Sequence, residues 1–329
     1  MISIRNNEGS RLVEVHEASK YSWIDARRPS REELDSLERD YRINPEHIQD
    51  IMDSDEQARI EKEDEYTLLI VRLPVFDARS EISYYTLPCG ILLFPDRVLT
   101  ICQADCEPLQ ELSRGKEKGL DLRNKSAFVL HLLGRAAIVY LRYLKEINRR
   151  NSAIEADLQR SVKNYELTQL LSMEKSLVFF TTSLKSNEIL LEKLQSSKAM
   201  RFKEDEAELL EDVLTDNKQA IEMANIYSDI LSGMMDAFAS VISNNLNIQM
   251  KRLTIISIVL MIPTLVVSIF GMNVKVPLED NPHAFSIIVG LCVLAGLFGA
   301  FFLTGKPKSK PKSSKQAEPG APGGGLKEL

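Results

Sequence analysis

The sequence lacks the motifs of the common enzyme classes. It contains no glycine-rich phosphate-binding loop, no nucleophile elbow and no His-Glu metal motif, so we expect no catalytic activity. Its four cysteines include Cys102 and Cys106, but no second Cys or His pair stands near them to complete a metal site. These residues are therefore predicted to be reduced cysteines of a cytosolic domain.

A signal peptide and an excess of basic charge are also missing. The first residues, MISIRNNEGS, contain no apolar signal-peptide core, so residues 1–250 are expected to stay in the cytosol. The net charge is −6, and residues 306–329 hold six lysines and two glutamates, or +4, which leaves −10 for the remainder. An acidic body argues against nucleic acid as a partner and is compatible with the attraction of cations.

Helix-breaking residues are nearly absent from the middle of the chain. No proline occurs between Pro108 and Pro263, and only two glycines lie between residues 125 and 270. A segment that mixes apolar and charged residues and contains so few helix breakers is predicted to form long helices. We expect them at 125–160, at 163–199 and from Lys203 to Phe270.

Two long runs near the carboxyl end contain no charged residue. Leu253–Phe270 has 18 residues and Ala284–Thr304 has 21. As helices they would span roughly 27 and 31 Å, at about 1.5 Å per residue. A bilayer core is about 30 Å thick, so both runs are predicted to be transmembrane helices. Only Gly271–His283 separates them, and the two helices should form a hairpin.

Basic residues set the predicted orientation of this hairpin. Lys251 and Arg252 precede the first run, and four lysines follow the second between residues 306 and 312. By the positive-inside rule, both termini of this multi-pass protein of the cell membrane should be cytoplasmic, with 271–283 as an external loop. The Pro-, Gly-, Ser- and Lys-rich tail, 305–329, is expected to be disordered, with its lysines near anionic lipid headgroups.

The amino-terminal third has the pattern of an α/β domain. Ser30 and Glu33 form a capping box that predicts one helix start, and Asn44 followed by Pro45 predicts another. Runs rich in Val, Ile, Leu and Tyr predict strands at Leu12–Val15, Tyr66–Val75, Ile82–Phe94 and Val98–Cys102. The expected division is an α/β domain at 1–120, a helical hairpin at 121–202, and a stalk helix at 203–270 that continues into the membrane.

One face of the predicted stalk helix carries a stripe with many polar residues. From Asp236, steps of three or four residues lead to Ser240, Ser243, Asn247, Met250, Leu253, Ser257, Met261, Thr264 and Ser268. Hydroxyls in a span either line water, pack helix against helix or bond to their own backbone. Asn247 on the same stripe favours a water-lined pore. Since one helix cannot enclose a pore, this interpretation requires a ring of identical subunits.

Phe270-Gly271-Met272-Asn273 stands directly at the end of the first run. A Gly-Met-Asn sequence at the outer end of the first of two carboxyl-terminal spans resembles the signature of the CorA family of magnesium transporters. Trp23-Ile24-Asp25, Pro29 with Glu32-Glu33-Leu34, Pro45 and Tyr66–Pro74 resemble the family's opening pattern, so the resemblance covers residues 20–304. It implies a homopentameric funnel with an α/β cytosolic domain, long stalk helices and a central pore in the bilayer.

The resemblance also implies roles for individual residues. Gly271, Met272 and Asn273 would form the ion-selecting mouth, with Gly271 allowing a sharp turn and five Asn273 amides accepting hydrogen bonds from hydrated Mg²⁺. Rings of Leu253 and Met261 would be apolar constrictions that gate by dewetting. The other implied positions are Asn247 and Thr264 in the pore, and Asp77, Asp212 and Asp236 as cytosolic metal-binding residues through which intracellular Mg²⁺ regulates opening.

The external loop departs from the family pattern. Many members continue with Met-Pro-Glu, whereas this chain has Val274-Lys275-Val276-Pro277, and Glu279 and Asp280 supply acidity at a different position. The cation preference is therefore open. Hard oxygen ligands favour Mg²⁺, and transport of Zn²⁺ or Co²⁺, as in the related ZntB type, is the alternative. An alternative from another class is a membrane-anchored coiled-coil scaffold.

Overall fold

The structure, a computed structural model, describes residues 2–8, 11–115, 120–158, 164–196, 202–272 and 282–304. The chain divides into two units, Met1–Ser240 and Val241–Leu329, and the boundary falls inside one long helix. The predictions for Asn273, Glu279, Asp280 and the tail at 305–329 lie outside the described residues.

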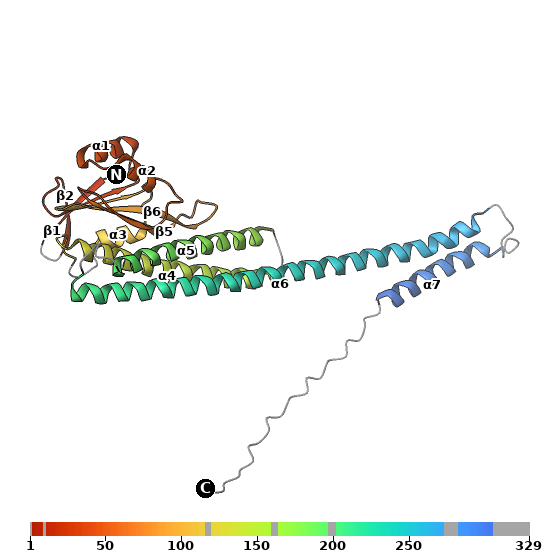
Figure 1. The fold of residues 1–329 in the computed structure, drawn as a ribbon. Coiled ribbons are helices and arrows are strands. Elements are labelled where there is room, and N and C mark those ends of the chain that lie inside the picture. Colours follow the sequence, from red (N-terminus) through yellow and green to blue (C-terminus); the bar gives the residue numbers. More distant parts are fainter. Residues whose placement is uncertain are drawn as a thin grey trace, which may run out of the picture. The chain divides into compact units, whose positions relative to one another are not determined.

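Within the described residues of the first unit, seven strands form one mixed sheet in the order β2-β1-β3-β7-β6-β5-β4 (Figure 1). β3 and β7 run parallel, and the other neighbouring pairs are antiparallel. The strands predicted from the sequence correspond to β2, β5, β6 and β7, whereas β1, β3 and β4 were missed. Their bounds are β1 Ile2–Glu8, β2 Arg11–Val15, β3 Ser22–Arg27, β4 Arg59–Lys62, β5 Thr67–Phe76, β6 Tyr84–Leu93 and β7 Arg97–Cys102.

Helices cover both faces of the sheet, which explains why β5 and β6 are apolar almost throughout. Successive β5 residues alternate between the two cores, so that Leu68 packs with Leu37 of α1 while Leu69 packs with Phe128 of α4. On one face lie α1 (Arg31–Tyr41) and α2 (Pro45–Ile51), and on the other lie α3 (Glu107–Ser113), α4 (Lys125–Leu158) and α5 (Asn164–Ser196) (Figure 1). The predicted α/β class is confirmed.

The predicted helix starts are also confirmed. The Glu33 N–H donates to Ser30 Oγ (3.2 Å), and the Ser30 N–H donates to Glu33 Oε2 (2.9 Å), which completes the capping box of α1. At α2, Asn44 Oδ1 accepts from the Glu46 N–H (3.0 Å), and Pro45 is the first helical residue. These bonds satisfy donors that the helix itself leaves unpaired.

The helix α6 (Glu204–Phe270) packs with α4 and α5 in the first unit. A Cβ on Gly134 of α4 would lie 3.1 Å from Val213 of α6, and Asn124, just before α4, bonds to Glu206 near the start of α6, so the two helices run parallel. α4 is apolar enough to span a membrane, but 56% of its most apolar window is buried. Its apolar residues therefore form a core with the neighbouring helices. Tyr140 and Leu144 of α4 belong to the same buried cluster as Phe180 of α5 and Ile221 and Ala224 of α6.

A buried guanidinium joins the sheet to α5. Arg72 of β5 donates to the carbonyl oxygens of Ser54 (2.6 Å) and Glu56 (2.7 Å) and to Ser183 Oγ of α5 (3.2 Å). Asn187 of α5 bonds the backbone of the same residue, accepting from the Arg72 N–H (2.9 Å) and donating to Arg72 O (2.8 Å). Because these neutral acceptors satisfy the buried charge, its desolvation is offset.

Arg72→Met is predicted to destabilise the first unit by about 3 kcal/mol or more, because several buried acceptors would lose their donor. The urea midpoint of the full chain in mild detergent, followed by far-UV circular dichroism, measures this change. Arg123→Met is the matched control, because the Arg123 side chain is 76% exposed. Equal midpoints for the two variants would show that Arg72 is not a structural anchor.

Candidate ion pathway

The second unit contains the apolar end of α6 and the helix α7 (Ala284–Thr304), which contact each other along one face. Cys292 Sγ lies 3.8 Å from Pro263 O, and a Cβ on Gly299 would lie 3.2 Å from Ile262 Cδ1. None of the most apolar window of α6 is buried. The less exposed positions of this part of α6 mark the α7-facing side, and they are Ile255, Val259, Ile262, Pro263, Val266 and Phe270.

The stripe predicted from the sequence lies on the opposite side of α6. Four members of the stripe in this segment follow an α7-facing residue by two positions, and they are Ser257, Met261, Thr264 and Ser268. Residues two positions apart in an α-helix are separated by roughly 160° around the helix axis. In the single chain the stripe is exposed, and Met261 retains 66% of its accessible surface. All of its members from Asn247 onward are exposed, and they are Asn247, Met250, Leu253, Ser257, Met261, Thr264 and Ser268.

Hydroxyl groups on the stripe bond to their own helix, one of the alternatives that the sequence left open. Ser257 Oγ donates to Leu253 O (3.0 Å), and Thr264 Oγ1 donates to Leu260 O (2.8 Å). The hydroxyl hydrogen is thereby used, whereas the oxygen keeps a free lone pair. These exposed oxygens are acceptors, which suit the outward-pointing hydrogens of water molecules around a cation.

The helix α6 ends next to the Gly-Met-Asn sequence. The Gly271 N–H donates to Val267 O (2.9 Å), and Met272 is 57% exposed. The expected sharp turn does not use a left-handed backbone at Gly271. A Cβ there would lie 3.3 Å from Val267 O, the oxygen to which the Gly271 N–H donates.

The three predicted metal-binding aspartates lie in the described residues. Asp77 follows β5, is half-buried, and accepts through Oδ1 from the Arg79 N–H (2.9 Å). Asp212 and Asp236 are exposed on α6. Within the described residues of one chain, no three His, Cys, Asp or Glu side chains gather as metal ligands. The carboxylates suit Mg²⁺ by their chemistry, because this ion prefers oxygen ligands.

Three cysteines, Cys89, Cys102 and Cys106, form a buried thiol cluster. Cys102 Sγ and Cys106 Sγ are 4.0 Å apart, and Cys89 lies opposite Cys102 on the neighbouring strand. A hydrogen bond with Cys102, together with burial, raises the pKa of the Cys89 and Cys106 thiols. The prediction that these cysteines are free is confirmed, and the raised pKa of Cys89 and Cys106 favours the protonated form of those two thiols.

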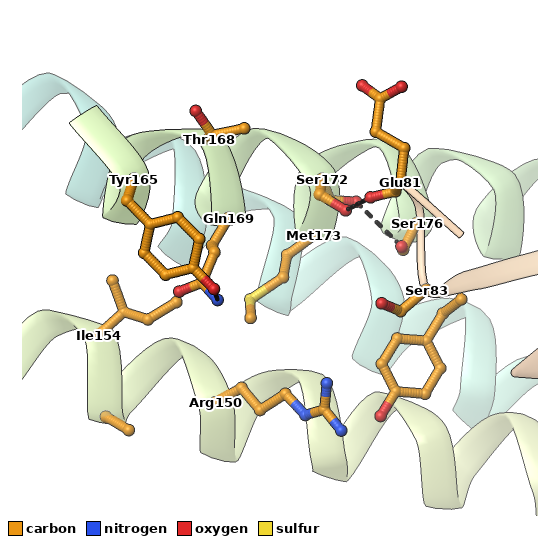
Figure 2. Close-up of a pocket in the computed structure, with 12 residues that line it drawn as sticks. Glu81, Ser83, Arg150, Ile154, Tyr165, Thr168, Gln169, Ser172, Met173 and Ser176 are labelled. Carbon is orange, nitrogen blue, oxygen red and sulfur yellow. Dashed lines mark hydrogen bonds between the residues drawn. The ribbon is translucent and has the colours of Figure 1, made fainter. Parts of the chain in front are cut away.

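A pocket of about 410 Å³ opens between α4, α5 and the loop that joins β5 to β6 (Figure 2). Tyr165 and Gln169 of α5 point toward Ile154 of α4, and the lining includes one carboxylate residue, Glu81. One carboxylate beside the cationic Arg150 is a poor divalent-cation site. The stripe of α6 is therefore the better candidate for an ion pathway.

Residues 18–306 match the family described as CorA-like Mg²⁺ transporter protein. The chain belongs to the CorA family. It is 28% identical over 277 residues to the cobalt/magnesium transport protein CorA of Methanocaldococcus jannaschii, covering 83% of this chain and 86% of that protein. The match to the family includes α6, α7 and the Gly-Met-Asn sequence between them.

Solved structures have the same fold as this CorA-family chain. The complete CorA magnesium transporter of M. jannaschii superposes with a TM-score of 0.75 at 25% identity, over 92% of this chain and 96% of that one. The cytoplasmic domain of ZntB from Vibrio parahaemolyticus superposes with a TM-score of 0.54 at 12% identity, over 74% of this chain and 98% of that domain. The latter likeness is one of fold alone.

Substituted cysteines should distinguish the two sides of α6. Met261→Cys in reconstituted protein is predicted to react with a small cationic thiol reagent, because its stripe faces water. Val259→Cys should stay unmodified, because it faces α7. Mass spectrometry measures the modification, and Cys292 serves as an internal unreactive thiol because it is buried. Equal labelling at both positions would contradict a water-lined stripe.

Proposed function

We propose that this CorA-family chain is a homopentameric channel that carries Mg²⁺ across the cell membrane. The observation that carries the proposal is the position of Gly271-Met272 at the end of an exposed stripe on the side of α6 away from α7, whose polar members include Ser257 and Thr264. Family membership supports it, as does the relative named as a cobalt/magnesium transport protein. α6 and α7 would form the membrane hairpin, with both termini cytoplasmic and the loop outside.

In a ring of five chains, the opposite faces of α6 have different neighbours. α7 packs against the side marked by Val259 and Ile262, which would direct the stripe toward the central axis and α7 toward lipid. Rings of Leu253 and Met261 would form apolar constrictions that close by dewetting. The polar rings would come from Asn247, Ser257, Thr264 and Ser268.

The mouth would select a hydrated ion. Mg²⁺ releases its water reluctantly, so a ring of Asn273 amide oxygens would accept hydrogen bonds from the ion's water shell instead of replacing it. Glu279 and Asp280 in the external loop would raise the local cation concentration. Gly271 and Met272 would set the position of this ring at the end of α6.

Intracellular Mg²⁺ would control opening through carboxylates. Asp77 and Asp212 of neighbouring subunits would repel each other until a cation binds between them, and Asp236 would contribute to a further cytosolic site. Binding to the closed ring alone would stabilise that state, and loss of the ion would favour opening. The exposure of Asp212 and Asp236 leaves their carboxylates accessible to such an ion.

Ion uptake into liposomes that contain the purified chain tests this proposal. We expect Mg²⁺ uptake that Co²⁺ inhibits in competition. Zn²⁺ uptake without Mg²⁺ uptake would instead support a ZntB-like carrier, and the absence of any flux would support the scaffold alternative. The comparison uses protein-free liposomes as the baseline.

Asn273→Ala is predicted to abolish selective Mg²⁺ flux while the pentamer remains assembled, because the substitution removes the acceptors of the mouth. Uptake of Mg²⁺ against competing monovalent cations measures selectivity, and light scattering after gel filtration measures assembly. Retained Mg²⁺ selectivity in the assembled variant would remove Asn273 from the mechanism.

Asp212→Ala is predicted to lose much of the protection from proteolysis that millimolar Mg²⁺ gives the unmodified chain. The substitution removes both the repulsion and the ligand, so Mg²⁺ would no longer shift the equilibrium toward the closed ring. Gel densitometry over a Mg²⁺ titration gives the midpoint of protection. Glu222→Ala is the control, since Glu222 is another exposed carboxylate of α6. An unchanged midpoint in Asp212→Ala would assign Asp212 to a solvated surface.

A further inference from the structure

We infer that Arg150 of α4 and Ser172 of α5 are positioning residues, which hold the loop 77–83 in place and thereby raise the affinity of the regulatory site for Mg²⁺. This loop joins β5 to β6 and begins with Asp77. The inference rests on the proposed function, in which Asp77 is a ligand of the regulatory ion. It concerns contacts within one chain and adds two helix residues to that regulation.

The loop is closed on itself around Asp77. The Asp77 N–H donates to Ser83 O (2.9 Å), and Asp77 O accepts from the Ser80 N–H (3.2 Å). Asp77 Oδ1 also accepts from the Arg79 N–H (2.9 Å). This last bond uses one of the roughly four lone-pair positions of a carboxylate, so the group is oriented and can still bind a cation. The position of the loop therefore determines the position of the carboxylate.

Arg150 contacts the residues at both ends of this loop. Phe76, the last residue of β5, and Tyr84, the first residue of β6, are cross-strand partners whose ring centroids are 4.9 Å apart. The Arg150 guanidinium carbon lies 5.4 Å from the ring centroid of Tyr84 and 5.7 Å from that of Phe76. Both distances are within the ~6 Å range of a cation–π interaction. One cation of α4 thus holds both ends of the loop.

A carboxylate on the same helix orients Arg150. Glu146, one turn earlier on α4, accepts from Arg150 Nε (3.2 Å). This bond balances the charge of the guanidinium and leaves its planar face for the two rings. Arg149 pairs with the same carboxylate at 3.5 Å, but its side chain is 81% exposed and contacts no aromatic ring in the part of the chain that the structure describes. Arg149 is therefore a matched control.

Ser172 holds the middle of the loop from the other helix. Ser172 Oγ donates to Glu81 O (2.8 Å), and Figure 2 shows this bond on the opposite side of the pocket from Arg150. The pocket of about 410 Å³ is lined by residues of the loop and of both helices. Because this space replaces a packed core beneath the loop, the contacts of Arg150 and Ser172 determine where the loop lies.

The position of the loop bears on affinity, since an ordered loop binds an ion more tightly than a mobile one. Without the two anchors, ion binding would have to offset the conformational entropy of ordering the loop. The apparent affinity then falls in proportion to the fraction of chains whose loop is in place. Electrostatics alone predicts the opposite change, because removal of a nearby positive charge favours a bound Mg²⁺. The direction of the change therefore separates the two effects.

Arg150→Met tests the inference in the full-length chain in mild detergent. The Mg²⁺ concentration at the midpoint of protection from proteolysis should rise about fivefold, because the cation–π contacts are lost. Arg149→Met removes the same charge from the same carboxylate and should leave the midpoint unchanged or lower it. Arg150→Lys keeps the charge without the planar guanidinium, so its midpoint should lie between those of Arg150→Met and the unmodified chain.

Ser172→Ala tests the second anchor. The midpoint should rise about twofold, because the loop loses one hydrogen bond. Ser152→Ala is the control, since Ser152 is also an exposed serine and its Oγ donates to Asn148 O (3.2 Å) within α4. Equal midpoints for these two variants would remove Ser172 from the inference.

Amide hydrogen exchange measures the order of the loop directly and does not depend on regulation. In Mg²⁺-free buffer, residues 77–83 should exchange faster in Arg150→Met than in Arg149→Met, whereas exchange in β7 should be equal in the two variants. Equal exchange of the loop, or an unchanged or lowered Mg²⁺ midpoint in Arg150→Met, would overturn the inference. Asp77→Ala distinguishes that failure from failure of the proposed function. If Asp77→Ala has the midpoint of the unmodified chain, Asp77 is no regulatory ligand, and the proposed regulation itself is contradicted.

Discussion

The fold depends on α6 remaining one helix through different surroundings. Glu206 caps its start, Asn217 donates to Leu184 O (3.0 Å) within the helical core, and the side chains beyond Val241 are mostly exposed in the single chain. A helix bonds its own backbone groups, so the same element is stable in a protein core and in lipid. Pro263 interrupts this bonding, and the packed Cys292 thiol lies beside its carbonyl oxygen. Breaking α6 would separate the proposed regulatory carboxylates from the proposed pore.

Elements defined by local signals could be predicted from the sequence, and elements defined by distant partners could not. The capping residues Ser30 and Asn44 act within three residues, so their helices could be placed. The strand β3 contains Asp25, and a charged residue in the sequence argues against a buried strand. In the structure Asp25 is nevertheless only 1% exposed. Its partners are Arg27 (2.5 Å) and, on β7, Thr100 (2.9 Å), which lies 75 positions away. The sequence near β3 contains no sign of that pairing.

The candidate site divides in the same way. Helical periodicity predicts the stripe from Asn247 to Ser268, because residues three or four apart share a face. Which side of α6 faces α7 depends on contacts such as Ile262 with Gly299, which only the folded hairpin reveals. The Arg72–Asn187 connection joins residues 115 positions apart and has no local signature either. The proposed relation of Asp77 to Asp212 would depend on a second chain, and thus on symmetry rather than on either residue's surroundings.

Symmetry also bears on how the proposed pore would treat its ion. An inner-shell Mg²⁺ site requires six oxygens in near-octahedral geometry at about 2.0–2.1 Å. A ring of five identical side chains cannot supply an octahedron, but it can accept hydrogen bonds from a hydration shell that already has one. The stripe has the matching polarity, since the hydroxyl hydrogens of Ser257 and Thr264 are bonded to the backbone and their oxygens remain as acceptors. The arrangement thus favours passage of a cation with its water retained, and a preference among cations would then depend on the size and strength of the hydration shell.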